Sequence, residues 1–352
     1  MMPSAPLTPL VVRFGAFGDM VMTIPMLKAL AQRYGRPCDV LSSGPWTAPL
    51  LSRVPEVGRL LLLSSRRAPY LFNASQRDFV RWLRQRPPGP VYVFESDDTS
   101  HWLLRHAGIG AEWICSLRDL APGLGEHTTT QQLRLAACTP RALAGTWPAP
   151  DSDAVSHDAR PSLSAADIAD AQDWLARKGL ADAPLVLFQP GNKKTMRAGA
   201  RQRASNVKYW PEQRWAEVMA GVHASLPEAR LLLCGSPAER ALAEDIRARC
   251  AFDRVDIATD DLPIPRLLAV QARAHSMVSI DTGPAHSAAA MGCPVVVLFA
   301  RREARISSIP IATTAPVMSL GPASAQDDAS LMSILPGQVL ETWRQLVSLR
   351  VK

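Results

Sequence analysis

The stretch M-V-S-I-D-T-G-P-A-H-S-A-A-A-M-G, residues 277–292, places a short apolar run directly before a tight turn and an alanine-rich segment. Residues 277–280 are typical of a buried parallel strand. The segment that follows favours a helix with Pro284 at its first position. A strand that leads through a turn into a helix is the repeating unit of α/β proteins. The stretch therefore predicts that fold class.

Short apolar runs alternate with segments of helical spacing over most of the chain, which predicts parallel sheets covered by helices. In the first half we expect strands at residues 10–14, 39–42, 60–63, 91–95 and 113–115, and helices at residues 20–34 and 76–85. In the second half we expect strands at residues 185–189, 230–234, 254–257, 277–280 and 295–299. The pattern predicts two similar α/β halves.

A segment rich in Pro, Ala, Ser and Asp, residues 139–161, interrupts the periodicity and is typical of a linker. Ser164 and Asp167 then approximate a capping box for a helix that Gly179 ends. We therefore expect one domain at residues 1–150 and a second at 160–325. A final helix within 336–352, expected at 338–349, is predicted to pack back on the first domain. A ligand cleft is expected between the carboxyl ends of the two sets of strands.

The composition predicts a folded protein that lies inside the cell. The chain has 352 residues, of which 47% are hydrophobic and 20% charged, and its apolar runs fall far short of the ~20 residues of a spanning helix. No positive cluster leads the chain, so we expect no secretory signal and a cytoplasmic location. The six cysteines are dispersed and are expected to be buried thiols without a metal site. The net charge of +7 favours anionic partners.

The first strand ends in R-F-G-A-F-G-D, residues 13–19, with Gly15 and Gly18 in the turn and Asp19 at the start of the next helix. Glycines permit a close approach of the backbone there. Asp19 has two interpretations, a general base or a charge that only complements the helix dipole. The spacing is not the G-x-G-x-x-G fingerprint, so a nicotinamide cofactor is not indicated.

The turn after residues 277–280 is suited to an anion. Asp281, Thr282 and Gly283 open the helix, and amides at a helix N-terminus bind phosphate. His286 lies one turn into the helix, either as a ligand-binding side chain or as a packed core residue. D-T-G also occurs in aspartic proteases, but those need paired loops in a β-rich fold, so that class is excluded.

A basic segment follows residues 185–189 and contains no acid. It could clamp a diphosphate or a phosphorylated acceptor, or it could be a solvated loop. Its only aromatic residues are Tyr209 and Trp210, so nucleic acid is not expected as a partner. Its cations are Lys193, Lys194, Arg197, Arg201, Arg203 and Lys208.

Glu239 follows the strand expected at residues 230–234, in C-G-S-P-A-E-R. An acid at this place can accept hydrogen bonds from ribose hydroxyls, as in other nucleotide-binding α/β units. Alternatively it is only a charge at a helix N-terminus. The sequence leaves both interpretations open.

Four motifs together resemble the lipopolysaccharide heptosyltransferases of glycosyltransferase family nine. They are G-A-F-G-D-M-V-M-T-I-P, P-G-N followed by K-Y-W-P-E-Q-R-W-A-E-V, C-G-S-P-A-E-R and S-I-D-T-G-P-A-H-S-A-A-A, in this order over residues 11–299. The resemblance implies a GT-B fold, with two Rossmann-like domains whose sheets face a central cleft. It implies an inverting, metal-independent transfer from ADP-heptose to a lipopolysaccharide core acceptor, with no cofactor besides the donor.

The resemblance also implies roles for single residues. Asp19 corresponds to the base of the first loop, Lys208 to the lysine that contacts phosphate, and Glu239 to the acid of the ribose loop. Residues 281–286 correspond to the segment that holds the diphosphate, and Lys194 is grouped with them. The expected partners are a nucleotide sugar and an anionic glycolipid at the inner membrane surface, with peripheral attachment there. Another nucleotide-sugar transferase, an epimerase and a non-catalytic relative remain alternatives.

Overall fold

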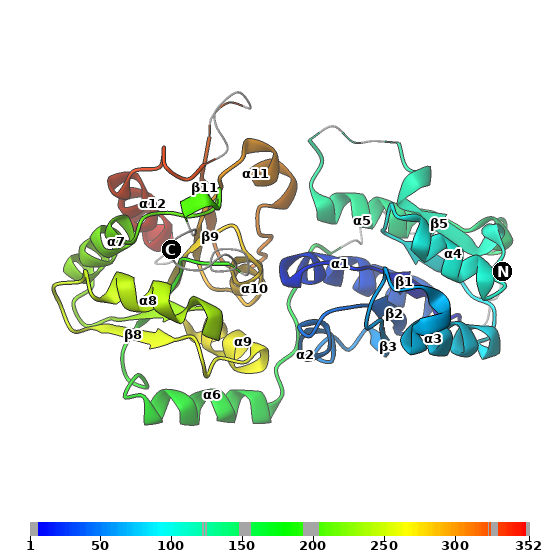
Figure 1. Cartoon of the computed structure of the whole chain (residues 1–352), viewed down its shortest axis with the longest axis horizontal. Coiled ribbons are helices and arrows are strands. Elements are labelled where there is room, and N and C mark those ends of the chain that lie inside the picture. Colours follow the sequence, from blue (N-terminus) through cyan, green and yellow to red (C-terminus); the bar gives the residue numbers. More distant parts are fainter. Residues whose placement is uncertain are drawn as a thin grey trace. The chain divides into compact units, whose positions relative to one another are not determined.

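The chain forms two compact units, unit 1 at Met1–Ser162 and unit 2 at Leu163–Lys352. The computed structural model describes residues 6–121, 123, 125–147, 156–192, 204–322, 324 and 330–349. Each unit contains one parallel sheet with helices around it (Figure 1). The division falls at the end of the segment whose composition predicts a linker.

Unit 1 contains a five-stranded sheet in the order β3-β2-β1-β4-β5, and all its strand pairs are parallel. The strand order reverses between β1 and β4, and such a switch point is where open α/β sheets bind ligands. The strands are β1 (Leu10–Val12), β2 (Cys38–Ser42), β3 (Val57–Leu62), β4 (Val91–Val93) and β5 (Ile114–Ser116).

Helices complete unit 1. Buried side chains of α3 and α4 pack on one face of the sheet, while α1 packs against α2, α5 and β2. The helices are α1 (Phe17–Tyr34), α2 (Thr47–Leu51), α3 (Ala74–Gln85), α4 (Asp98–His106) and α5 (Thr128–Ala137). Short 3-10 turns join them at η1 (Tyr70–Phe72), η2 (Ala111–Trp113), η3 (Leu117–Asp119) and η4 (Arg141–Leu143).

Unit 2 contains a six-stranded sheet in the order β11-β10-β9-β6-β7-β8, again with only parallel pairs. Its strand order reverses between β6 and β9. The strands are β6 (Leu185–Gln189), β7 (Arg230–Cys234), β8 (Val255–Ala258), β9 (Ser276–Ile280), β10 (Val295–Leu298) and β11 (Val317–Leu320).

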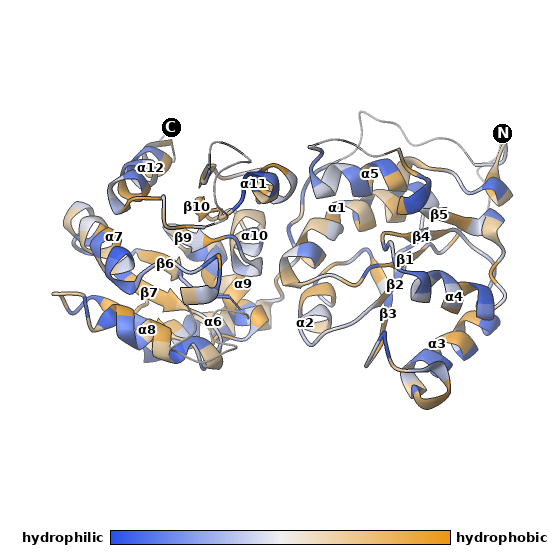
Figure 2. Ribbon diagram, turned by 45° about the horizontal axis from the view of Figure 1, so that its top comes forward, coloured by the Kyte–Doolittle hydropathy of each residue, from blue (hydrophilic) through white to orange (hydrophobic). Residues whose placement is uncertain are grey.

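Both faces of this sheet are buried, because helices cover each of them. Successive side chains of a strand point to opposite faces. Val186 and Phe188 of β6 pack towards α7, α8 and α12, whereas Leu185 and Leu187 pack towards α6, α9 and α10. β6 and β7 are accordingly hydrophobic over most of their length (Figure 2). The helices are α6 (Ala165–Arg177), α7 (Glu212–Ser225), α8 (Arg240–Arg247), α9 (Ile264–Arg273), α10 (Gly283–Ala290), α11 (Arg302–Ser308) and α12 (Pro336–Ser348), with a 3-10 turn η7 (Pro237–Glu239) before α8.

The final helix, α12, corrects one prediction, because its apolar side belongs to the core of unit 2 and not to unit 1. Val339, Trp343 and Leu346 form its apolar stripe and are buried with side chains of α7 and β10. Trp343 is 2% exposed, and its indole N–H donates to Ser276 Oγ at 2.9 Å. The spacing of the apolar stripe is that of a helix packed on a sheet. These contacts show that the sheet is the one in unit 2.

The predicted α/β class is confirmed, and the predicted strands agree with the observed ones to within three residues at each end. Ser164 caps α6 and Asp167 completes the box, as predicted. Strand β11 was not predicted. All six cysteines are free, and four are buried. Every helix in the described ranges is too short or too polar to cross a bilayer.

Candidate functional site

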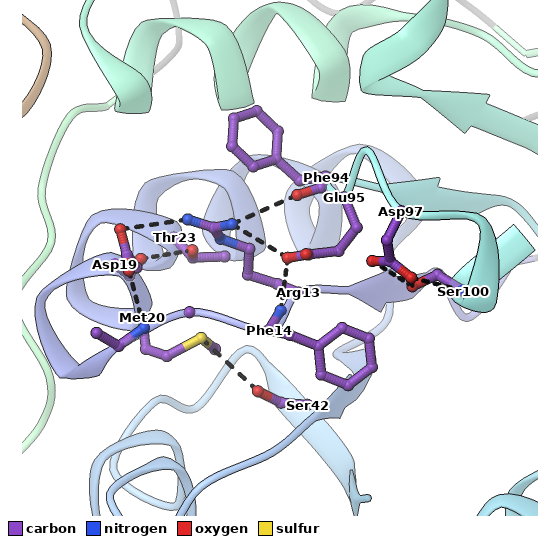
Figure 3. Close-up of polar contacts among 12 residues, drawn as sticks. Arg13, Phe14, Asp19, Met20, Thr23, Ser42, Phe94, Glu95, Asp97 and Ser100 are labelled. Carbon is purple, nitrogen blue, oxygen red and sulfur yellow. Dashed lines mark hydrogen bonds and ion pairs between the residues drawn. The ribbon is translucent and has the colours of Figure 1, made fainter. Parts of the chain in front are cut away.

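In unit 1, the carboxyl ends of β1 and β4 bring Arg13, Asp19 and Glu95 together at the switch point (Figure 3). Arg13 Nη2 lies 3.3 Å from Asp19 Oδ1, and Arg13 Nη1 lies 3.1 Å from Glu95 Oε1. Arg13 also lies over the ring of Phe94, 5.0 Å from its centroid. One guanidinium group therefore joins the two carboxylates.

Asp19 is the third residue of α1, and it lies in the first turn of that helix, where one of the two interpretations expects a helix-terminal charge. Its Oδ2 accepts a hydrogen bond from the Ala16 N–H at 2.8 Å, which caps the helix. The side chain is nevertheless 37% exposed. A carboxylate has about four acceptor positions. One amide and one guanidinium contact therefore leave acceptor capacity for a ligand hydroxyl.

The two glycines of this loop have different surroundings. A Cβ on Gly15 would lie 2.4 Å from Cβ of Asp19, so only glycine lets the loop approach the helix this closely. The Gly15 carbonyl also accepts a hydrogen bond from the Trp46 indole at 3.1 Å. Gly18 is buried in the first turn of α1. Gly15 thus helps to fix the position of the Asp19 side chain.

Glu95 was not predicted as a site residue. It is 9% exposed, and its Oε1 accepts a hydrogen bond from the Phe14 N–H at 2.7 Å. Burial raises the pKa of Glu95, while the contacts with Phe14, Arg13 and Arg66 oppose that rise. Arg66 Nη1 lies 3.5 Å from Glu95 Oε2 and 3.8 Å from Asp97 Oδ2. The only sequence signal for Arg13 and Glu95 was a charged residue at the end of an apolar run.

In unit 2, Lys208 contacts Asp281 at the carboxyl end of β9. Its Nζ donates to the Asp281 carbonyl at 2.8 Å and pairs with Oδ2 at 2.5 Å. The Lys208 N–H donates to Asn206 Oδ1 at 2.9 Å, which fixes the backbone beside the ammonium group. An ammonium group has three protons. The third proton is available to an anion, because the Lys208 side chain is 34% exposed.

Gly283 begins α10, so Pro284 is the second residue of the helix, one position later than predicted. Thr282 is the N-cap residue with extended backbone, and its side chain makes no capping hydrogen bond to the described start of the helix. The first amides of a helix lack intrahelical partners, and the helix dipole adds positive potential there. This end of α10, next to Lys208, can therefore bind a phosphate group. His286 lies in the first turn of α10 and is 5% exposed.

Glu239 lies in the loop after β7 and is 6% exposed. Its Oε2 accepts hydrogen bonds from the Ser236 N–H at 2.8 Å and from Ser236 Oγ at 2.7 Å. Its Oε1 has a weaker contact, 3.4 Å from Gln189 Nε2. Burial raises the pKa of Glu239, and the Ser236 hydrogen bonds oppose that rise. One oxygen thus caps η7, and the other has capacity for a further donor.

The position of Glu239 depends on Gly191, just beyond β6. A Cβ on Gly191 would lie 2.3 Å from Glu239 Oε1. β6 lies between β7 and β9, so Glu239 and the Lys208–Asp281 pair flank the carboxyl end of one strand. This end is the switch point of the sheet. Lys194, predicted to join the group, lies outside the described residues.

A cavity of about 450 Å³ lies elsewhere in unit 2, and no predicted site residue lines it. Charged groups in its wall pair with each other, as Lys178 does with Asp261 at 2.9 Å. Its lining residues are Trp174, Lys178, Leu180, Leu232, Arg240, Glu244, Arg247, Asp256, Ile257, Asp260 and Asp261. In the described ranges, no group of three or more His, Cys, Asp or Glu side chains is placed to hold a metal ion.

Comparison with known families places part of the chain in one family. The model of glycosyltransferase family 9 (heptosyltransferase) matches residues 126–333, more than half of the chain. The match contains Lys208, Glu239 and residues 281–286. A search of curated protein sequences finds no significant match.

Solved structures similar to the chain extend over both units. E. coli ADP-heptose lps heptosyltransferase II has a TM-score of 0.72 at 20% identity, covering 98% of this chain and 100% of that one. A family 9 glycosyltransferase from Veillonella parvula has a TM-score of 0.76 at 15% identity, covering 99% of each. E. coli heptosyltransferase WaaC with ADP has a TM-score of 0.68 at 18% identity, covering 96% and 99%, and was also solved with ADP-2-deoxy-2-fluoro heptose. At these identities the matches show the fold, which is GT-B.

Proposed function

We propose a specific reaction for this chain, which belongs to glycosyltransferase family 9, the heptosyltransferase family. In this reaction the glycosyltransferase moves a heptose from ADP-heptose to a lipopolysaccharide core or related acceptor. The similar E. coli enzyme solved with ADP and with an ADP-heptose analogue supports an adenine nucleotide sugar as the donor. The net charge of +7 favours an anionic donor and acceptor.

The observation that carries the proposal is the Lys208 ammonium group held beside the start of α10. In our proposal, the donor diphosphate meets Lys208 and the amides at Thr282 and Gly283. Charge-assisted hydrogen bonds of this kind are stronger than neutral ones. Glu239 Oε1 accepts a hydrogen bond from a ribose hydroxyl, at the adjoining end of β6.

The proposed reaction is a single displacement at the anomeric carbon of the donor. Asp19 takes the proton of the acceptor hydroxyl while that oxygen forms the new glycosidic bond. The bond from the anomeric carbon to the diphosphate oxygen breaks, its electron pair leaves with ADP, and the anomeric configuration inverts. Lys208 and the α10 amides stabilise the charge that develops on the diphosphate. Since these groups supply the positive charge, we expect activity to survive chelation of metal ions.

A donor screen with a transfer assay tests the proposal. Binding stabilises the folded state by mass action, so ADP and ADP-sugars are expected to raise the melting temperature, unlike UDP, GDP and CMP compounds. ADP-heptose and a delipidated core saccharide are expected to give ADP and a lengthened saccharide. Conversion of the donor without acceptor would indicate an epimerase. Tight ADP binding without turnover would indicate a non-catalytic relative.

A further inference from the structure

The loop between β3 and α3 presents two apolar side chains to solvent. Phe72 is 84% exposed and Leu71 is 75% exposed, the highest values for large hydrophobic residues in the described part of the chain. Both belong to the 3-10 turn η1. Single exposed apolar side chains are common on protein surfaces, but two neighbours this exposed need a further explanation.

Buried polar side chains hold this loop in one conformation. Asn73 Nδ2 donates to the Ser65 carbonyl at 2.6 Å, and Gln76 Nε2 donates to the carbonyls of Ser65 and Ala68 at 3.0 and 3.2 Å. Asn73 and Gln76 are themselves 3% and 2% exposed. The exposed tip is therefore a fixed projection of unit 1, because its base is anchored in the core.

Aromatic rings stand next to the tip. Tyr70 of η1 packs edge-on against Trp102 and His106 of α4, with ring centroids 5.4 and 4.7 Å apart. The rings of Trp102 and His106 stack at 4.7 Å. Trp102 is 40% exposed. Tyr and Trp rings of this kind prefer the boundary between water and an apolar phase.

Arginines continue the surface along α3. The segment at residues 64–86 contains six arginines, of which Arg66 and Arg86 pair with acids outside it. Arg67 is exposed, and the one acid of the segment, Asp78, pairs with Arg81 at 2.8 Å. Arg77, Arg81 and Arg84 recur at helical spacing, so they lie along one side of α3. Arg77 donates to the Leu71 carbonyl at one end, and Arg84 Nη2 donates to the His106 carbonyl at 2.8 Å at the other. The arginine stripe is thus continuous with the apolar tip and the aromatic rings.

We propose that this η1 surface, made of Tyr70–Phe72, Trp102, Arg67 and the α3 arginine stripe, docks unit 1 on a bilayer that contains anionic lipids. An apolar tip enters the boundary between headgroups and acyl chains, while nearby arginines contact lipid phosphates. A bilayer fits better than a protein partner, because the strongly exposed apolar side chains of this surface form only a small tip beside a row of cations, whereas a stable protein interface buries about 800 Å² on each side. The proposal deepens the proposed function and rests on it for the identity of the lipid-linked acceptor.

The same loop connects this surface with the candidate site of unit 1. Arg66 lies six residues before Phe72, its guanidinium group 3.5 Å from Glu95 Oε2 and over the ring of Phe14. A loop with one part against Glu95 and another part in a bilayer would bring the headgroup of a lipid-linked acceptor to the Arg13–Asp19–Glu95 cluster. No element that crosses the membrane is needed for this arrangement.

Co-sedimentation of the full chain with vesicles tests the proposal. We expect binding to phosphatidylcholine vesicles that contain phosphatidylglycerol and little binding to phosphatidylcholine alone. Raising the salt from 0.1 M to 1 M shortens the Debye length from about 10 to about 3 Å, so the binding should weaken strongly. Removing both apolar side chains with Leu71→Ser and Phe72→Ser should lower the partition coefficient at least about tenfold.

Matched variants in unit 2 serve as controls. Ile168 and Met332 are 43% and 48% exposed, so the double change Ile168→Ser and Met332→Ser removes as many exposed apolar side chains at other places. We expect this variant to bind vesicles like the wild type. The double change Arg67→Gln and Arg81→Gln should reduce binding to the anionic vesicles about tenfold or more. The melting temperature of each variant shows that it is folded.

Two outcomes would overturn the proposal: no binding to the anionic vesicles, or undiminished binding by the folded Leu71→Ser and Phe72→Ser variant. The first outcome would favour a protein as the occupant of the surface. Neither outcome bears on the proposed reaction, because ADP binding and transfer to a delipidated saccharide are measured without lipid. A variant that loses vesicle binding but keeps this transfer is the expected result.

Discussion

Arg13 Nη2 lies 3.3 Å from Asp19 Oδ1, while the other terminal nitrogen of the same guanidinium group lies 3.1 Å from the buried carboxylate of Glu95. The two acids belong to segments after different strands, β1 and β4. The position of Asp19 therefore depends on an arginine that itself is held by a second, more deeply buried acid.

Replacement of Arg13 by glutamine should destabilise unit 1. The change leaves the Glu95 carboxylate buried with fewer partners, and removing one member of a buried ion pair costs about 3 kcal/mol or more. Urea unfolding at neutral pH measures this. Arg134→Gln is the control, because its partner Glu126 forms a pair whose arginine is 40% exposed, worth about 0–1 kcal/mol. Equal losses in the two variants would contradict the assignment.

Replacement of Asp19 by asparagine separates catalysis from helix capping. Asparagine retains an oxygen for the Ala16 N–H but cannot take a proton, so kcat should fall about 10²- to 10⁴-fold. The Kd of ADP should not change. Asp167→Asn is the control, since Asp167 has the same capping position in α6 and no proposed role. Full activity of Asp19→Asn would remove Asp19 from the mechanism.

Replacement of Lys208 by methionine should weaken ADP binding. It removes a charge-assisted contact worth about 1.5–3 kcal/mol, which corresponds to a rise in Kd of about 10- to 150-fold. Titration calorimetry with ADP gives this Kd. Lys178→Met is the control, because it removes a lysine from a comparable pair with Asp261 in the same unit. This change should leave the Kd of ADP unchanged. An unaltered Kd in Lys208→Met would refute the diphosphate contact.

The buried carboxyl group of Glu239 should make the free energy of unfolding depend on pH. Burial raises its pKa in the folded state above the ordinary value of 4.5, so between these two values the folded state binds more protons than the unfolded state. Its contribution to stability is therefore present below pH 4.5 and is lost as the pH rises through the folded pKa. On acidification, the free energy of unfolding of the wild type should therefore rise relative to that of Glu239→Gln.

Glu217→Gln, at an exposed position of α7, should follow the wild type across the same pH series. The ribose contact has its own readout. The wild type should bind 2′-deoxy-ADP or 3′-deoxy-ADP less tightly than ADP, and Glu239→Gln should lose that preference. A preference that survives in Glu239→Gln would place the ribose elsewhere.

Replacement of Gly15 by alanine should displace Asp19. The new Cβ would lie 2.4 Å from the Asp19 Cβ, so the loop or the helix must shift, at a cost of about 1–3 kcal/mol. We expect both stability and kcat to fall. Gly58→Ala is the control in the same unit, because its new Cβ would meet its nearest atom at 3.6 Å, an ordinary contact. Wild-type kcat in Gly15→Ala would show that the loop geometry is unimportant.

The sequence predicts the strands well where both faces of a strand are buried. β6 and β7 each contain four successive apolar residues and were predicted at their observed bounds. β11 was missed, because its side chains are all half-buried at the edge of the sheet and prolines surround it. α12 was predicted as a helix but assigned to the wrong unit. Its periodicity shows an apolar side without showing which sheet that side covers.

The candidate site was predicted in part for a similar reason. Asp19 and Glu239 were recognisable because each follows a glycine turn at a strand end, whereas Lys208 was one of six cations in a basic segment and only the family resemblance singled it out. The contact between Arg13 and Glu95 joins residues 82 positions apart, and it depends on β4 being the neighbour of β1. A single sequence does not give that strand order. The Lys208–Asp281 contact, over 73 positions, depends in the same way on the place of β9 beside β6.

The packing of α12 means that the two units become complete at different points of translation. Unit 1 ends at Ser162, and because domains generally fold as units during synthesis, we expect it to fold while the ribosome is still making the rest. The core of unit 2 is complete only after α12 has been made, because Val339, Trp343 and Leu346 belong to it. A nascent chain interrupted before α12 would therefore expose the apolar side chains of unit 2 that this helix covers.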